Sequence, residues 1–258
     1  WRIPFLISIV LLGVGWYIRV KVPESPDFEK VKDQAKEIKV PALQVFKNHP
    51  KELLTIIFAR AAENAWFYIA STFALAYTTT KLGIARQDIL FATICGGGLI
   101  MIMTPLFGHL SDKVGQRNMF MSGLLVLALY CYPFFSMLDT KDPFLVWLAI
   151  VLAIGVVFPL MYAPQSQLFA RQFPTEIRYS GISISVQFAG VIGGGLAPLI
   201  ATKLLSIGEG SPHLIINYII GMAIFAIFCT CFMKRDKLSI RSTKATINNT
   251  TKTDLSRP

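Results

Sequence analysis

Residues 108–118 read GHLSDKVGQRN and lie between two long apolar stretches. Gly, Ser and Asp favour turns, and Lys113 and Arg117 add positive charge to the same short segment. The segment therefore predicts a loop between two helices. The composition of the flanking stretches decides which solvent surrounds those helices.

The chain as a whole is too apolar for an ordinary soluble protein. Of its 258 residues, 53% are hydrophobic and 16% are charged, whereas a soluble domain carries about 25% charged residues. The mean hydropathy is +0.54. This composition indicates that lipid is the main solvent.

The apolar residues gather in stretches long enough to cross a bilayer as helices. A hydrocarbon core of about 30 Å needs about 20 apolar residues per helix, whereas barrel strands would be alternating segments of about ten residues. The long, continuous stretches predict an all-α integral membrane protein with seven transmembrane helices. Their approximate bounds are 3–18, 53–79, 89–107, 119–138, 145–169, 181–205 and 214–233.

The net charge of +10 is distributed along the chain as a membrane topology would require. Lys and Arg are abundant in every second connection and after the last apolar stretch, and they are sparse in the alternate connections. Because basic residues mark cytoplasmic loops, we expect residues 108–118 and the C-terminus in the cytoplasm. Topology accounts for the charge, so the lipid bilayer is the expected partner and nucleic acid is not.

Four regions follow from this topology. They are a transmembrane helix at 1–20, a polar cytoplasmic linker at 21–50, a six-helix transmembrane domain at 51–233 and a cytoplasmic tail at 234–258. The six helices form two triplets of inverted topology, as in many secondary transporters. Because the chain starts within an apolar stretch, we expect an N-terminal part to precede Trp1.

No motif for covalent chemistry or cofactor binding is present in the sequence. All four Cys lie inside apolar stretches, without the spacing of a metal site or a disulfide framework. No nucleophile triad and no phosphate-binding loop is present. We therefore expect no enzymatic activity, no metal and no cofactor.

Arg60 and Glu63 are the main charges inside a predicted transmembrane helix. A charge at membrane depth costs roughly 2.5–3.5 kcal/mol on insertion scales, so both should have partners. Their i, i+3 spacing places them on one helix face, where they could form a structural ion pair. Alternatively, Glu63 carries a proton and Arg60 is the counter-charge of an anionic substrate.

Other polar residues could complete a cavity for a small polar metabolite. Asn64 and Tyr68 share a helix face at i, i+4, and the apolar stretches 145–169 and 181–205 contain further polar candidates. Each could instead form a hydrogen bond between helices. The candidates for the substrate and proton pathway are Arg60, Glu63, Asn64, Tyr68, Tyr162, Gln165 and Gln187.

Small residues and proline interrupt the stretch 181–205. Gly190 and Gly194, four residues apart, predict close helix packing, and Pro198 loosens the helical backbone. Close packing and hinging during a transport cycle are both compatible with this pattern.

The segment 108–118 resembles the loop signature of the major facilitator superfamily, G-x-L-[SA]-D-[RK]-x-G-[RK]-[RK]. Two further segments agree: PESPDF at 23–28 resembles an element that follows the sixth of twelve helices, and FPTEIRYSG at 173–181 with GVIGGGLAPLIATKLL at 190–205 is similar to the metabolite:proton symporter branch. That branch includes carriers for shikimate, 2-oxoglutarate, citrate and proline or betaine. The signature positions that match are Gly108, Leu110, Ser111, Asp112, Lys113, Gly115 and Arg117.

The resemblance implies a fold and a function. The chain would comprise the sixth helix, the central linker and the C-terminal half of a twelve-helix carrier in the bacterial inner membrane. Its partners would be a small organic acid or zwitterionic metabolite and the missing N-terminal half. The carrier would work as a symporter by alternating access, with the proton gradient as its energy source.

Two positions depart from the family pattern. Gln116 stands where the signature has a basic residue, and Arg171 stands where the family tends to have an acid, two residues before Phe173. We therefore expect a rearranged conformational latch in the signature loop. Its expected members are Gly108, Asp112, Lys113, Gly115 and Arg117 with Glu176 or Arg178.

Two alternatives to an active carrier remain. A seven-helix receptor fits the topology, but a retinal protein would need a Lys in the middle of 214–233, which has none, and a receptor gives no reason for the signature loop. The other alternative is a half-carrier that does not transport, since half of the cavity between the two halves would be absent.

Overall fold

The computed structural model of the chain describes residues 3–21 and 41–234, with side chains from residues 8 and 42 onward. Most of the predicted linker, including 23–28, and the tail from residue 235 lie outside the described residues. The chain divides into two units, residues 1–41 and 42–258. In the first unit, α1 (Ile3–Lys21) contains the first predicted transmembrane stretch, and its described side chains are exposed.

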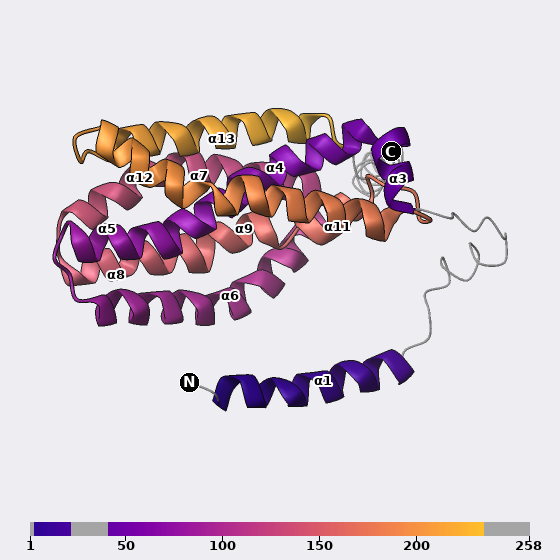
Figure 1. Ribbon diagram of the computed structural model, residues 1–258, viewed down its shortest axis with the longest axis horizontal. Helices are drawn as coiled ribbons and strands as arrows, with labels where there is room; N and C mark the ends of the chain where they lie inside the picture. The colour runs from indigo at the N-terminus through magenta and orange to yellow at the C-terminus, as the bar shows by residue number, and fades with distance from the viewer. Residues whose placement is uncertain (1–2, 22–40, 235–258) are drawn as a thin grey trace, which may run out of the picture. The chain divides into compact units, whose positions relative to one another are not determined.

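The second unit is a bundle of long helices (Figure 1). Within the described ranges every regular element is helical, which confirms the all-α class. In chain order the elements are α3 (Pro41–Asn48), α4 (Pro50–Tyr68), η1 (Ile69–Phe73), α5 (Ala74–Thr80), α6 (Arg86–Val114), α7 (Gln116–Asp139), α8 (Pro143–Leu152), η2 (Ala153–Val157), α9 (Phe158–Tyr162), α10 (Gln165–Ala170), α11 (Arg178–Ala189), η3 (Gly190–Gly195), α12 (Ala197–Ile207) and α13 (His213–Cys231).

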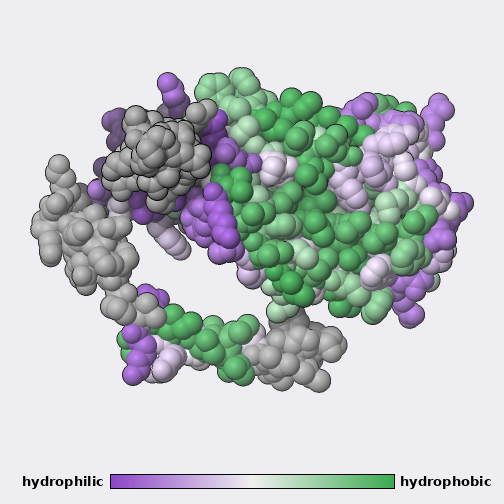
Figure 2. All heavy atoms as spheres, turned by 180° about the vertical axis from the view of Figure 1, so that it is seen from behind, coloured by the Kyte–Doolittle hydropathy of each residue, from purple (hydrophilic) through white to green (hydrophobic). Residues whose placement is uncertain are grey.

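Five helical stretches of the described residues are long and apolar enough to cross a membrane: 86–114, 116–139, 143–170, 178–207 and 213–231. Figure 2 shows a broad hydrophobic surface on the bundle between more hydrophilic ends. The predicted spans 3–18 and 53–79 lie in α1 and in the continuous helix from α4 to α5, and Arg60, Glu63 and Asn64 make that second helix more polar. The count of seven spans stays a prediction.

Successive helices of the bundle run in opposite directions. Glu52, in the first turn of α4, lies 3.8 Å from Lys234, just after α13, and Arg117 Nη2 at the start of α7 donates to the carbonyl of Cys231. We call this end, which holds residues 108–118 and the connection 171–177, the signature end. At the far end, Lys81 Nζ donates to the carbonyl of Gly210.

Three π-helical turns interrupt the long helices: η1 after α4, η2 after α8 and η3 after α11. Such turns widen the helix locally and free backbone groups for other partners. Trp66, fully buried, donates from Nε1 to the carbonyl of Ala153, the first residue of η2, at 3.1 Å. The indole of Trp66 therefore links the helix α4–η1–α5 to the helix α8–η2–α9 at the first residue of η2.

Close packing of η3 on α4 depends on Gly193 and Gly194. A Cβ at Gly193 would lie 2.2 Å from the carbonyl oxygen of Ala61, and one at Gly194 would lie 2.7 Å from the Tyr68 ring. A Cβ at Gly190 would meet nothing within 4 Å. The tight contact predicted for Gly190 and Gly194 is therefore made by Gly193 and Gly194, both of which lie in the π-helical turn η3 that packs on α4.

Candidate functional site

The charged residues of α4 meet α10 inside the bundle. Arg60 Nη1 donates a hydrogen bond to Gln165 Oε1 at 2.5 Å. Glu63, one turn further along α4, is 1% exposed, and its nearest charged and hydrogen-bonding neighbours are Arg60 and Gln165. The structure thus brings together three of the residues that the sequence singles out, from segments more than 100 positions apart.

Four side chains of this region contain a buried atom without a hydrogen-bond partner. The atoms are Arg60 Nε, Glu63 Oε2, Asn64 Nδ2 and Gln165 Nε2. A buried polar atom left unpaired typically costs about 1–3 kcal/mol, and such atoms are rare in folded proteins. A cluster of them marks a place where a water, a proton or a ligand group completes the hydrogen bonding. We call these four residues the polar cluster.

The described hydrogen bond of Arg60 goes to Gln165, although Glu63 stands at the i, i+3 position that favours an ion pair. The polar cluster therefore contains a guanidinium and a carboxyl group that each retain an unpaired buried atom. Such a site can hold an anionic group at Arg60 and exchange a proton at Glu63.

Two of the predicted tyrosines lie close in sequence to the polar cluster: Tyr68 ends α4, and Tyr162 ends α9, three residues before Gln165 begins α10. Tyr68 and Tyr162 are 41% and 42% exposed, and their rings pack against Phe67 and Phe158 with centroid distances of 5.8 and 5.1 Å. They are partly accessible from outside the bundle. Gln187 is exposed on α11, and no described contact joins it to the polar cluster.

The signature loop contains a second group of polar contacts, at the signature end. Gln116 Nε2 donates to Asp112 Oδ1 at 3.2 Å and to Gln167 Oε1 at 2.7 Å. Gln167 Nε2 also donates to Asp112 Oδ1, at 3.3 Å, and Arg171 Nη1 donates to Gln116 Oε1 at 3.0 Å. We call Asp112, Gln116, Gln167 and Arg171 the latch network, which ties α6 and α7 to α10.

The other residues expected in the latch, namely Arg117, Arg178, Glu176 and Lys113, lie outside the latch network. Arg117 binds the Cys231 carbonyl at 2.8 Å, and Arg178 Nη2 donates to Thr175 Oγ1 at 3.2 Å. Glu176 and Lys113 are exposed. None of these contacts reaches the latch network among the described residues.

The loop predicted at 108–118 is largely helical: residues 108–114 complete α6 and residues 116–118 begin α7, so Gly115 alone separates the two helices. The two glycines of this segment have different roles. Gly115 has φ +96° between the end of α6 and the start of α7, a conformation that side chains disfavour. Gly108 supplies the carbonyl that accepts from Ser111 Oγ at 2.7 Å. Gly115 therefore permits the sharp turn that places Asp112 and Gln116 side by side.

The sequence did not predict that Gln116, Gln167 and Arg171 would join Asp112 in one hydrogen-bonded network. The available signal was the pair of departures from the family pattern, at Gln116 and Arg171. These two residues are in contact, so the amide accepts from the guanidinium where the family pattern would pair a base with an acid.

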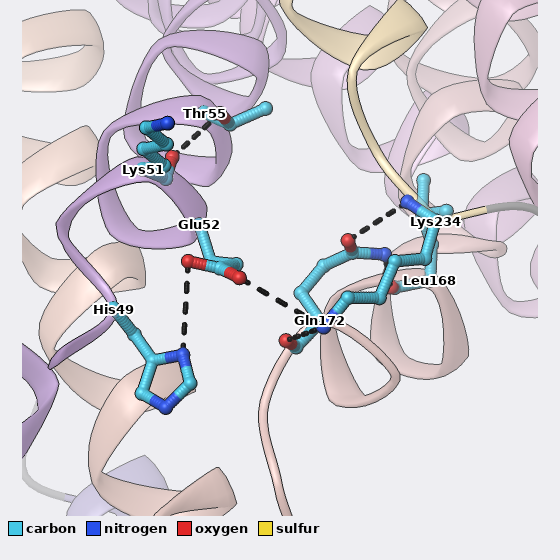
Figure 3. Close-up of polar contacts among 7 residues, drawn as sticks. All are labelled: His49, Lys51, Glu52, Thr55, Leu168, Gln172 and Lys234. Atoms are coloured by element: carbon cyan, nitrogen blue, oxygen red, sulfur yellow. Dashed lines mark hydrogen bonds and ion pairs between the residues drawn. The ribbon is translucent and has the colours of Figure 1, made fainter.

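A further tie at the signature end joins the start of α4 to the end of α13 (Figure 3). Glu52 lies 3.7 Å from His49 and 3.8 Å from Lys234. Gln172 accepts from the backbone N–H of Lys234 at 3.0 Å and donates to the Leu168 carbonyl at 3.0 Å. Glu52, Gln172 and Lys234 line a pocket of about 220 Å³.

The far end has a wider pocket of about 440 Å³, whose lining includes Asp139 and His213. Tyr77 OH donates to Asp139 Oδ1 at 2.5 Å. Within the described residues, no group of three or more His, Cys, Asp or Glu could hold a metal ion. The polar cluster remains the site with the most unpaired buried atoms.

Comparison with known proteins identifies a family and several relatives that the chain resembles. The model of the family described as Major Facilitator Superfamily matches residues 1–198. The shikimate transporter of Escherichia coli (strain K12) is 32% identical over 237 residues, which cover 91% of this chain and 54% of that protein. The inner membrane metabolite transport protein YhjE of the same organism is 30% identical over 236 residues, covering 89% of this chain and 53% of that protein.

A putative proline/betaine transporter of Staphylococcus aureus (strain COL) is 25% identical over 234 residues, covering 90% of this chain and 50% of that protein. The chain thus spans about half the length of the curated relatives it matches. No solved structure matches the chain significantly. The relatives named here are described as transporters of small metabolites.

Proposed function

The chain belongs to the major facilitator superfamily, and we propose that it forms the C-terminal half of a proton-coupled symporter for a small organic acid or zwitterion. It is an integral membrane protein with transporter relatives. Those relatives support a transport role over an enzymatic one or the receptor alternative. We place the carrier in the bacterial inner membrane, with the signature end and the C-terminus in the cytoplasm.

The observation that carries this proposal is the polar cluster. Shikimate, proline and betaine, named in the descriptions of the relatives, all carry a carboxylate. Arg60 is suited to bind a carboxylate because guanidinium–carboxylate hydrogen bonds are charge-assisted. Asn64 and Gln165 offer further unpaired N–H donors. Glu63 is the candidate proton carrier, since a buried carboxyl without a complete set of partners can gain and lose a proton.

Transport would proceed by alternating access. In the proposal, Arg60 and Asn64, the half-buried members of the polar cluster, line a cavity completed by an N-terminal half, so a half-carrier alone lacks one wall. The latch network and the Glu52–Lys234 tie hold helix ends together at the signature end and would stabilise one of the two conformations. No cofactor is required, because the proton gradient provides the energy.

Uptake by the full-length carrier in proteoliposomes tests this function. Labelled shikimate, proline and glycine betaine are offered with and without an inwardly directed proton gradient. We expect uptake of at least one of them to be accelerated by the gradient and abolished by a protonophore. Uptake that is indifferent to the gradient would refute proton coupling, and uptake of none would refute the substrate class.

Two variants test the assigned residues. Arg60→Ala should reduce uptake of the carboxylate substrate at least about tenfold, the loss expected for a charged hydrogen-bonding partner. Lys203→Ala removes a cation on the exposed surface of α12 and should leave uptake unchanged. Equal effects of the two substitutions would contradict a specific role for Arg60.

A further inference from the structure

Gln165 interacts with both charged residues of the polar cluster. It comes from α10, whereas Arg60 and Glu63 come from α4. Its Oε1 accepts from Arg60 Nη1 at 2.5 Å, its amide lies beside the Glu63 carboxyl, and it is 2% exposed. An amide from one helix is thus inserted beside an acid–base pair of another.

The arrangement keeps apart two charges that would otherwise pair. Residues at i and i+3 on a helix are neighbours, and removal from water strengthens the attraction between opposite charges. Nevertheless Arg60 Nε and Glu63 Oε2 both lack a hydrogen-bond partner. The short hydrogen bond to Gln165 directs the guanidinium toward α10, which accounts for the absence of a direct pair.

Few other charges compete for Glu63. The helices that pack against α4 contain Arg178 on α11, Lys203 on α12 and His213 on α13. Their other titratable side chains are Tyr162, Tyr179, Tyr218, Cys229 and Cys231. Burial has the largest influence on whether Glu63 is ionised, and Arg60 and Gln165 are the side chains that act on it next. Among charged groups, the protonation state of Glu63 is therefore linked to Arg60.

We propose that Gln165 is the positioning residue that prevents Arg60 and Glu63 from forming a direct ion pair, so that Glu63 exchanges a proton while Arg60 binds the substrate carboxylate. This inference rests on the proposed function. With Gln165 in place, Arg60 stays available to the substrate carboxylate, and protonation of Glu63 removes a nearby negative charge that would repel that carboxylate. Substrate and proton then bind together, as symport requires.

Without the amide, the two α4 side chains would pair with each other. A buried ion pair is stable once formed, because separating it leaves uncompensated charges in a low-dielectric environment. The pair would keep Glu63 ionised and Arg60 occupied. Both substrate binding and its dependence on the proton concentration would be lost together, and removal of the acid alone should restore substrate binding.

The test uses the full-length carrier and the substrate that it transports in the uptake assay. For Gln165→Leu, we expect the KM for that substrate to rise about tenfold and to become independent of pH. The double variant Gln165→Leu with Glu63→Gln should recover a KM near that of the unmodified carrier, because Arg60 is released, while remaining independent of pH. A purely structural role for Gln165 predicts that the double variant is no better than Gln165→Leu.

Each outcome decides the proposal. A Gln165→Leu carrier with an unchanged pH dependence of KM, or a double variant that does not recover substrate binding, would overturn it. If Gln165→Leu does not fold, as judged by size-exclusion chromatography, Gln165→Asn replaces it. Its shorter amide should cause the same rise in KM and the same loss of pH dependence. A Gln165→Asn carrier whose KM depends on pH as in the unmodified carrier would also overturn the inference. An unmodified carrier without proton-stimulated uptake would instead refute the proposed function itself.

Discussion

Arg171 Nη1 donates a hydrogen bond to Gln116 Oε1 at 3.0 Å across the interface of α7 and the end of α10. Gln116 is buried and belongs to the signature loop, whereas Arg171 lies more than 50 positions later in the chain. These are the two positions at which the sequence departs from the family pattern. The two departures therefore compensate each other: Gln116 replaces the base of the family pattern, Arg171 replaces its acid, and the new pair still forms a hydrogen bond.

Restoring the family pattern at one position should destabilise the latch network. Gln116→Arg places a second guanidinium beside Arg171 and removes its acceptor, so we expect the free energy of unfolding to fall by about 2 kcal/mol, within the range for hydrogen bonds to charged groups. Gln116→Arg combined with Arg171→Glu should recover most of this loss. Thermal unfolding of the purified protein in detergent measures both, and additive effects of the two substitutions would contradict the pairing.

The contact between η3 and α4 should tolerate no side chain at Gly193. A Cβ there would lie 2.2 Å from the Ala61 carbonyl oxygen, and Gly193→Ala should lower the free energy of unfolding by about 1–3 kcal/mol, as overpacking does elsewhere. Gly190→Ala is the matched control, because its Cβ meets nothing within 4 Å. In detergent, the unfolding temperature of Gly193→Ala should lie well below that of Gly190→Ala. The reverse order would show that Gly190 makes the close contact.

The hydrogen bond from Trp66 to η2 should contribute measurably to stability. Trp66→Phe leaves the buried Ala153 carbonyl without its indole donor, which should reduce the free energy of unfolding by about 1–3 kcal/mol. Trp147→Phe offers a control within the same protein, since Trp147 Nε1 is buried without a hydrogen-bond partner. If both substitutions shift the unfolding temperature equally, ring volume and not the hydrogen bond explains the effect.

Gln172 should hold the start of the segment after α13 in place. Gln172→Leu removes the acceptor of the Lys234 backbone N–H and the donor to Leu168, and we expect a loss of about 1–2 kcal/mol. Gln187→Leu, on the exposed surface of α11, should change stability by less than about 0.5 kcal/mol. Limited proteolysis after residue 231 provides a second measurement, which should be faster for Gln172→Leu alone.

Much of the helical architecture could be predicted from residue order. The apolar stretches 89–107, 119–138, 145–169 and 181–205 fall within four of the stretches that could cross a membrane, and 214–233 overlaps the fifth, 213–231. They could be predicted because length and apolarity are local properties. Gly115 similarly predicts the turn that it makes with φ +96°. The alternation of basic and non-basic connections agrees with the two ends of the bundle, since helices joined by short loops must reverse direction.

The contacts between helices could not be predicted in the same way. A helix that is apolar on all sides carries little information about which face meets its neighbour, and each residue turns the helix by about 100°. Whether Gly190 or Gly193 meets Ala61 depends on the widened turn η3, and the partner of Gln116 depends on the rotation of α10. Such contacts follow from the packing of the whole bundle.

The amino-acid sequence by itself determined the solvent, the helices, the polarity of their connections and the candidates Arg60 and Glu63, because each follows from local composition and spacing. Only the tertiary structure decided that Arg60 binds Gln165 and that Arg171 binds Gln116. The physical reason is that hydrogen bonds extend only about 3 Å. Residues distant in the chain meet within that distance only once the helices have packed at one particular rotation.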